Sequence, residues 1–181
     1  MEISFKKFEP QSESEALVSL LASQPWPFHV HSKVSEKQIQ QSIQEGNYSG
    51  ESVQTFWIIF NKTERVGIIK LFEMDDLEDG SPLFDIRILN EFQGTGIGQI
   101  AVKWLTGYLF KGWPSLNRIE GTTRVDNISM RKVLHNCGYV KEGHYRKSWP
   151  AENGILQDTV RYSILRDDWQ SGNPTPVNWA D

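Results

Sequence analysis

Three glycines lie close together in QGTGIG, residues 93–98, between a stretch typical of a strand and one typical of a helix. Because glycine has no Cβ atom, such a turn can direct several backbone N–H groups at one anion. The helix that follows adds the positive end of its dipole. The pattern therefore favours binding of a pyrophosphate, and a tight turn without a ligand is the alternative that three glycines alone leave open.

Two other glycine-rich phosphate sites fit this sequence poorly. A dinucleotide-binding turn should follow the first strand of a βαβ unit, and the next strand should end in an acidic residue. Here the next predicted strand ends in Thr123, Arg124 and Val125. A P-loop requires Lys followed by Ser or Thr after the last glycine, and Gly98 is followed by Gln99.

Two carboxylates on predicted strands could act on a substrate. In LFDIRIL, residues 83–89, strand alternation places Asp85 and Arg87 on the face opposite the apolar side chains. Asp85 could accept a proton there, or it could form a salt bridge with Arg87 or a neighbouring strand. Glu120, within NRIEGTT, is the second candidate base, with a solvated or paired strand residue as the alternative.

The remaining reactive side chains show no such pattern. Cys137 lies on the apolar stripe of a predicted helix, so we expect it in the core rather than as a nucleophile. No histidine has metal-ligand spacing, so no metal site is predicted. We expect ordinary surface or loop positions for all of them: His29, His31, His135 and His144.

An acidic loop follows the second strand of a predicted hairpin. Charge runs of this kind are usually solvated surface, and the alternative is that the loop steers a cationic amine to a pocket. Its acidic residues are Glu73, Asp75, Asp76, Glu78 and Asp79.

The elements that must position these residues alternate in the second half of the chain. An antiparallel start followed by strand, helix, strand and helix predicts an α/β fold in which helices cover a mixed sheet. Ser12 with Glu15, and Ser35 with Gln38, are predicted capping boxes of the first two helices. Strands are expected at 3–8, 53–60, 65–74, 82–89, 117–125, 139–149 and 155–166, and the later helices at 96–110 and 128–137.

Composition limits the classes of function. The 181 residues are 38% hydrophobic and carry a net charge of −4, which argues against a general nucleic-acid binder and for one globular unit. We expect a single domain over residues 1–170 and a loosely held tail over 171–181. The first residues, MEISFKKFEP, contain no long apolar run, so we expect a cytoplasmic protein with no membrane partner.

A second motif gives the glycine turn a context. DNIS, residues 126–129, precedes a helix that ends at Gly138 and is followed by VKEGHYR. Over roughly residues 3–169, the chain resembles the GNAT superfamily of acyl-CoA-dependent N-acyltransferases, and most specifically its ribosomal-protein alanine N-acetyltransferase (Rim-type) branch. The matching residues are Gln93, Gly96 and Gly98 in the first motif, and Asn127, Ser129 (one place early), Gly138, Tyr139, Glu142, Gly143 and Arg146 in the second.

The resemblance implies acetyl-CoA as cosubstrate and a mixed, mostly antiparallel central sheet with a parallel splayed pair, flanked by helices on both faces. The glycine turn would bind the pyrophosphate, and the edge of the preceding strand would pair with the pantetheine arm like an added strand. Asn127 would bind the arm, cap its helix, or do both. The implied cofactor-binding residues are Ile86, Arg87, Ile88, Leu89, Gln93, Gly94, Thr95, Gly96, Ile97, Gly98, Asn127 and Ser129.

Amide formation from a thioester needs a proton acceptor for the amine and stabilisation of the leaving thiolate. Asp85 and Glu120 are the candidate bases, and proximity with a chain of waters is the alternative. Many superfamily members carry a Tyr that acts as the general acid, seven residues after the position of Asn127. This chain has Leu134 there. That departure leaves Ser129 as the nearest hydroxyl to a thiolate, unless it serves only as a helix cap.

The leading hypothesis is an acetyl-CoA-dependent N-acetyltransferase that acts in a ternary complex on a protein N-terminus or a small amine. The alternative is a non-catalytic acyl-CoA-binding regulatory module, which Leu134 favours. The loop that carries Trp26 and Phe28 is a plausible acceptor wall and favours the enzyme. No nucleic-acid partner is expected, and a homodimer is compatible with the sequence.

Overall fold

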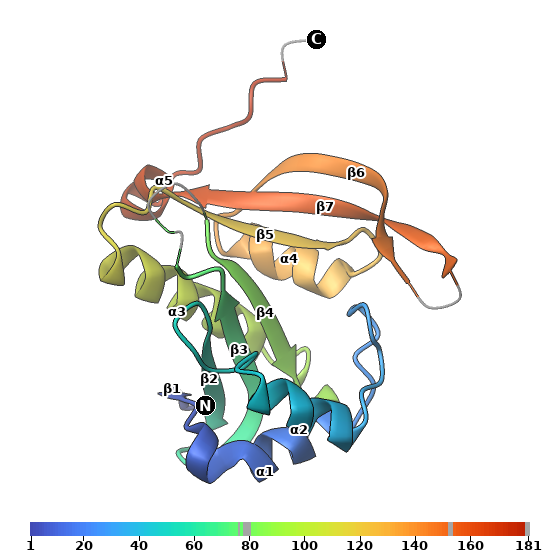
Figure 1. The fold of residues 1–181 in the computed structure, drawn as a ribbon. Helices are drawn as coiled ribbons and strands as arrows, with labels where there is room; N and C mark the ends of the chain where they lie inside the picture. Colours follow the sequence, from blue (N-terminus) through green and yellow to red (C-terminus); the bar gives the residue numbers. More distant parts are fainter. Residues whose placement is uncertain (76, 78–80, 152–153, 180–181) are drawn as a thin grey trace.

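A computed structural model describes residues 1–75, 77, 81–151 and 154–179, which form two antiparallel sheets and the helices around them (Figure 1). The first sheet has the strand order β1-β2-β3-β4 and the second has the order β5-β7-β6. Their strands are β1 (Ile3–Lys7), β2 (Gln54–Phe60), β3 (Glu64–Phe72), β4 (Leu83–Ile88), β5 (Arg118–Arg124), β6 (Val140–Pro150) and β7 (Leu156–Leu165).

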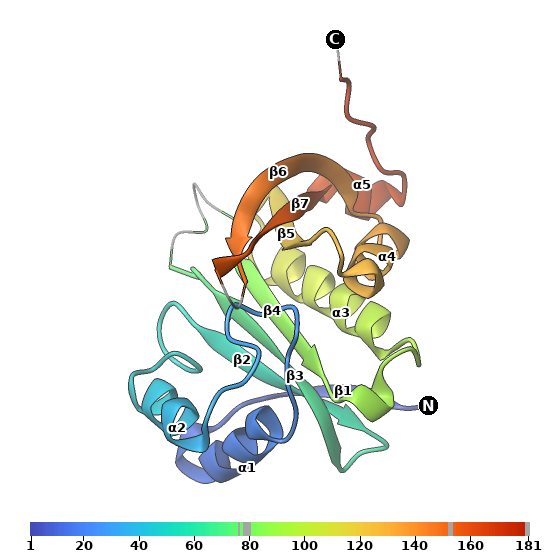
Figure 2. The same ribbon diagram turned by 90° about the vertical axis from the view of Figure 1, so that its right-hand side faces the viewer.

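Helices cover both faces of the first sheet, as predicted. Helices α1 (Pro10–Ala22) and α2 (Glu36–Gln44) pack on the face that carries Trp57 and Ile68. Helix α3 (Ile97–Gly112) packs on the opposite face, against Ile69 and its neighbours. Figure 2 shows these layers from the side. The remaining helices are η1 (Asn90–Phe92), α4 (Ile128–Asn136) and α5 (Arg166–Ser171), and η1 and α5 were not predicted.

The predicted start of α1 was wrong, whereas that of α2 is confirmed. Ser35 and Gln38 form the expected capping box. Helix α1 begins at Pro10, before Ser12, and its first turn is closed by the carboxylate of Glu13, which accepts the backbone N–H of Glu9. Proline at the first helical position has no N–H to satisfy, so the helix needs no capping box there.

The single mixed sheet that we predicted is divided in two. In the described part of the chain no ladder joins β4 to β5. Ser81, just before β4, instead donates its hydroxyl to Arg118 O at 3.3 Å and accepts the N–H of Glu120 at 3.1 Å, both at the start of β5. Beyond this bridge the two strands spread apart, because no backbone hydrogen bonds hold them together (Figure 1).

None of the helices that the structure describes is long and apolar enough to cross a membrane.

The buried carboxylate of Glu13 fastens α1 to the first sheet. Its side chain is 5% exposed and accepts four hydrogen bonds, from Lys6 Nζ, Arg65 Nη2, Trp57 Nε1 and the Glu9 N–H. Burial alone would raise the pKa of Glu13, but these donors outweigh it and lower the pKa to about 2. The ionised form therefore stabilises the fold.

We expect Glu13→Gln to lower the free energy of unfolding by about 2–3 kcal/mol at pH 7, because an amide cannot replace the charge among these donors. A lowered pKa in the folded state gives stability that is present above pH 4.5 and is lost as the pH falls toward 2. Urea unfolding of both proteins at pH 7 and pH 3 should show the difference shrinking at the lower pH. A difference independent of pH would contradict this role.

Candidate active site

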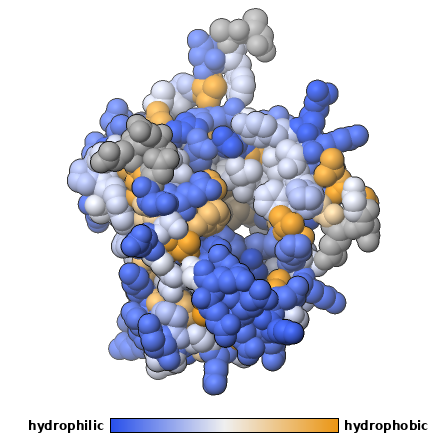
Figure 3. Space-filling model, viewed as in Figure 1, coloured by the Kyte–Doolittle hydropathy of each residue, from blue (hydrophilic) through white to orange (hydrophobic). Residues whose placement is uncertain are grey.

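A cavity of about 890 Å³ occupies the gap between β4 and β5. It continues under the loop between α1 and α2, here called the 24–34 loop after its residues. In Figure 3 the surface is hollowed between its upper and lower parts, with hydrophobic residues at the rim of the hollow. The split between the two sheets thus creates a site large enough for an extended ligand.

Most of the predicted site residues meet in this cavity. Those that line it are Asp85, Ile86, Arg87, Ile88, Gln93, Gly94, Gly96, Gly98, Asn127 and Ser129. Leu89, Thr95, Ile97 and Glu120 do not line it. Leu89 packs toward the α1 and α2 core, Thr95 is exposed, and Ile97 is buried in the main core.

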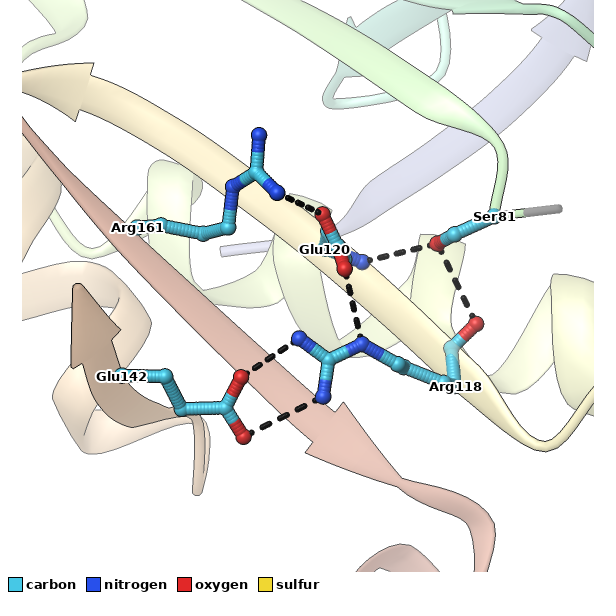
Figure 4. A network of polar contacts seen from close by, with 5 residues as sticks. All are labelled: Ser81, Arg118, Glu120, Glu142 and Arg161. Carbon is cyan, nitrogen blue, oxygen red and sulfur yellow. Dashed lines mark hydrogen bonds and ion pairs between the residues drawn. The ribbon is translucent and has the colours of Figure 1, made fainter. Parts of the chain in front are cut away.

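Glu120 lies in a polar network at the start of β5 (Figure 4). Its carboxylate pairs with Arg118 Nε at 2.8 Å and with Arg161 Nη1 at 3.2 Å, while Arg118 also holds Glu142. This network joins all three strands of the second sheet. The structure therefore does not bring Glu120 together with the other candidate residues.

The glycine turn has the geometry of an anion cradle. Gly94 and Gly96 have φ values of +75° and +91°, which favour glycine, and a Cβ added at either would meet nothing within 4 Å. No hydrogen bond within the described chain uses the backbone N–H groups of residues 94–98. Since these groups open helix α3, several uncommitted donors and a helix dipole point into the same open space.

The edge of β4 that faces the gap is also unpaired. Directly after β4, the N–H of Leu89 bonds to Val66 O on β3, so by the alternation of an antiparallel ladder Ile86 and Ile88 direct their backbone groups toward the gap. Gln93 Nε2 donates to Ile88 O at 2.9 Å and ties the turn to the strand end. The remaining groups can pair with an extended amide ligand.

Helix α4 begins at the opposite wall of the cavity. Asn127 caps it, accepting the N–H of Met130 at 3.2 Å and donating from Nδ2 to Thr123 Oγ1 at 3.1 Å. One Nδ2 hydrogen stays free for a ligand. Ser129 is exposed, and its hydroxyl makes no hydrogen bond in the part of the chain that the structure describes. The cap of α4 is thus Asn127, which leaves the Ser129 hydroxyl free for a ligand.

An unpredicted pair of side chains lies where the 24–34 loop meets β4. His29 Nε2 is 2.7 Å from Asp85 Oδ1, and Arg87 Nε is 3.0 Å from Asp85 Oδ2. Burial would raise the pKa of Asp85, but the His29 hydrogen bond and the Arg87 charge hold it well below its usual range. An ionised carboxylate only accepts, so Nε2 of His29 carries the proton.

This geometry corrects our expectation that His29 is an ordinary surface or loop residue. In the neutral ring the lone pair is on Nδ1, which is buried and has no hydrogen-bond partner among the described residues. Nothing in the sequence indicates the pair, since 56 positions separate the two residues.

Arg124 holds the 24–34 loop over the cavity. Its Nη1 donates to Pro27 O at 2.9 Å, and its guanidinium lies 5.4 Å from the centre of the Phe28 ring. Asp126 pairs with the same guanidinium from the other side. Strand β5 thus anchors a loop that is distant in the sequence.

Other predicted features lie outside this site. Burial raises the pKa of the Cys137 thiol to about 11, and Cys137 packs against the main core as predicted, so it is no nucleophile. Asp76, Glu78 and Asp79 of the acidic loop fall outside the described residues, and Glu73 and Asp75 do not line the cavity. Within the described ranges no cluster of His, Cys, Asp or Glu could hold a metal ion.

Comparison with known proteins places this site in a family context. The family model "Acetyltransferase (GNAT) domain" matches residues 6–140. "Putative ribosomal N-acetyltransferase YdaF" of Bacillus subtilis is 32% identical over 104 residues, and spermidine N(1)-acetyltransferase of Vibrio cholerae is 28% identical over 104 residues. Each alignment covers 58% of this chain, but only 55% and 58% of the respective relative.

Solved structures share the fold. The spermidine N-acetyltransferase of Vibrio cholerae, solved in complex with CoA and spermine, superposes with a TM-score of 0.76 at 20% identity. The match covers 93% of this chain and 98% of that one.

Removal of the Arg124 anchor should loosen the 24–34 loop. The lost bond and cation–π contact are worth about 2 kcal/mol together, so in Arg124→Met we expect at least tenfold faster amide exchange at Trp26 and His29. These amides donate within the loop, to Ser32 O and Trp26 O. Asp126→Asn, which keeps the Pro27 bond, is the matched control. Equal exchange in both variants would show that Arg124 is not the anchor.

Proposed function

The chain belongs to the GNAT acetyltransferase family, and we propose that it transfers an acetyl group from acetyl-CoA to a primary amine by direct attack in a ternary complex. One observation carries the proposal: uncommitted N–H groups of the glycine turn and the unpaired edge of β4 line a single cavity with a potential proton acceptor. Homologues named for ribosomal and spermidine acetylation make protein N-termini and polyamines the first acceptors to test.

The residues present fit acetyl-CoA. Residues 94–98 offer donors to a pyrophosphate, and Ile86 and Ile88 offer backbone groups to the amides of pantetheine. The free Nδ2 hydrogen of Asn127 lies on the other wall. Of the remaining cofactor-binding candidates, Thr95 and Ile97 would contribute backbone N–H groups only, because their side chains do not line the cavity.

The thioester supplies a carbonyl that a neutral amine can attack, forming the C–N bond as the C–S bond breaks. His29, whose ring lines the cavity, is the proposed general base, and its buried Nδ1 must become accessible to accept the amine's proton. Asp85, our first candidate base, is proposed as a positioning residue that fixes the tautomer and orientation of His29. Arg87 keeps Asp85 ionised and so keeps the proton on Nε2.

Ser129 is the proposed hydroxyl for the leaving thiolate. It lines the cavity in the first turn of α4, where the helix dipole also favours negative charge. The position of the family's usual tyrosine is filled by Leu134, which is fully buried. Because its apolar side chain cannot donate a proton to the thiolate, Leu134 favours the second candidate function, a non-catalytic acyl-CoA-binding module.

Thiol release on incubation with acetyl-CoA and a panel of amines separates the two functions. We expect release, with acetylated product found by mass spectrometry. Thr95→Glu should raise the KM for acetyl-CoA at least tenfold over Thr95→Gln, because the two side chains differ only in charge, and the difference should shrink with added salt. Binding of CoA without release for any amine would indicate the non-catalytic module, and absence of CoA binding would refute both.

His29→Gln should lower kcat/KM for the amine by about 100-fold or more, the usual range for loss of a general base. Asp85→Asn should cause a smaller loss, because the imidazole remains. His135→Gln, on the exposed side of α4, is the control. A His29→Gln enzyme with normal turnover would leave proton removal to water.

Ser129→Ala should lower kcat about tenfold, or about 1.4 kcal/mol, with an unchanged KM for acetyl-CoA, since the thiolate charge develops only in the transition state. Ser129→Thr should retain activity. Because the hydroxyl makes no bond in the described chain, the melting temperature should not move. Normal kcat in Ser129→Ala would exclude it as the acid.

A further inference from the structure

The cavity is cationic although the chain is acidic overall. The side chains that line it include four cations, Lys33, Lys70, Arg87 and Lys132, and one acid, Asp85. The net charge of the whole chain is −4, so this excess of positive charge is local. Lys132 and Lys33 are exposed, whereas Lys70 and Arg87 are half-buried.

Lys70 lies at the end of the cavity away from the glycine turn. It pairs across the ladder with Asp85, three residues before the last residue of β4, and the turn lies beyond that strand end. At about 3.3 Å per strand residue, this separates Lys70 from the strand end by about 10 Å. A pyrophosphate on the turn therefore cannot neutralise it, and the charge faces the acceptor end.

The Lys70 ammonium has no anionic partner in the described chain. It lies 5.1 Å from the centre of the Tyr48 ring and 5.2 Å from that of Phe72. Burial lowers its pKa, which Asp85 opposes and Arg87 reinforces. Asp85 forms no ion pair with Lys70, and the charge of Asp85 is balanced by its ion pair with Arg87.

Several hydrogen-bond donors on the cavity wall have no acceptor among the described residues. Neither Lys70 Nζ nor the Tyr48 hydroxyl makes a hydrogen bond among the described residues, and Trp149 Nε1, also on the cavity wall, is buried without a partner. A buried donor without an acceptor, such as Trp149 Nε1, is costly, and the half-buried Lys70 and Tyr48 groups are open to a partner from the substrate. A group with several acceptor oxygens meets this requirement best.

We propose that the acceptor is an amine that also carries an anionic group, a carboxylate or a phosphate, and that Lys70 binds this group. The proposal rests on the proposed acetyl transfer and specifies its substrate class. A polyamine is disfavoured by the same charges. Its second ammonium would face Lys70 and Arg87, and Asp85, the one acid among the described lining residues, is already paired with Arg87.

The test compares acceptors that differ only in charge. Initial rates of thiol release are measured with glycine against glycinamide, β-alanine against β-alaninamide, phosphoethanolamine against ethanolamine, and with spermidine. We expect kcat/KM to be at least tenfold higher for the anionic member than for the neutral member of at least one pair. Whether the carboxylate or the phosphate pair shows the larger ratio tells which anionic group Lys70 binds.

Variants of Lys70 assign the preference to its charge. Lys70→Gln should raise the KM of the preferred anionic amine at least fivefold and leave the KM for acetyl-CoA unchanged. Lys70→Arg should restore most of the preference, and the melting temperatures show whether each variant folds. Equal rates for charged and neutral members, or a preference for spermidine, would overturn the proposal while confirming acetyl transfer. If none of the amines causes thiol release, the proposed acetyl transfer itself would be refuted.

Discussion

The site depends on a backbone constraint, which is that β4 and β5 are joined at their starts and unpaired beyond. The hydroxyl of Ser81 closes the junction with two hydrogen bonds. The two strands also pack closely at this junction, since a Cβ on Gly121 of β5 would come within 2.9 Å of Phe84 Cζ on β4. Past this point the strand edges face a cavity, and their polar groups need partners from water or a ligand. A ligand that runs between them therefore completes the sheet rather than lying on its surface.

Charged side chains fix the walls of this gap from three directions. Glu13 holds α1 against the first sheet, the Arg118 network holds the second sheet together, and Arg124 ties the 24–34 loop to β5. Each contact uses an Arg, namely Arg65, Arg118 or Arg124, that binds a group distant in the sequence, with the fork geometry that suits carboxylates and carbonyls. The same loop then supplies His29 to a carboxylate on β4. The proposed base, the proposed cofactor edge and the proposed acceptor wall are thus positioned by one arrangement.

Local patterns predicted the parts of the site that a short segment determines. The glycine turn, the cap by Asn127 and the face of Asp85 follow from turn chemistry, capping and strand alternation, and the structure has all three. The His29–Asp85 pair did not follow, because a Pro-rich loop has no periodicity that fixes where it folds back. Glu120 is on a strand and paired, which is the alternative that the sequence left open, but its partners did not follow, because alternation gives a residue's face and the partners come from strands that the sequence does not align. The division into two sheets did not follow either, because nothing in the sequence shows that β4 and β5 are linked by the Ser81 side chain and not by a ladder.

The central claim is that the open edge of β4 and the glycine turn together hold coenzyme A. A titration of 15N-labelled protein with CoA, followed by amide NMR, tests it directly. The account predicts saturable shifts at Ile86, Ile88 and residues 94–98, with little change at the amides of α1, no residue of which lines the cavity. Saturation of binding with those strand and turn amides unmoved would contradict it.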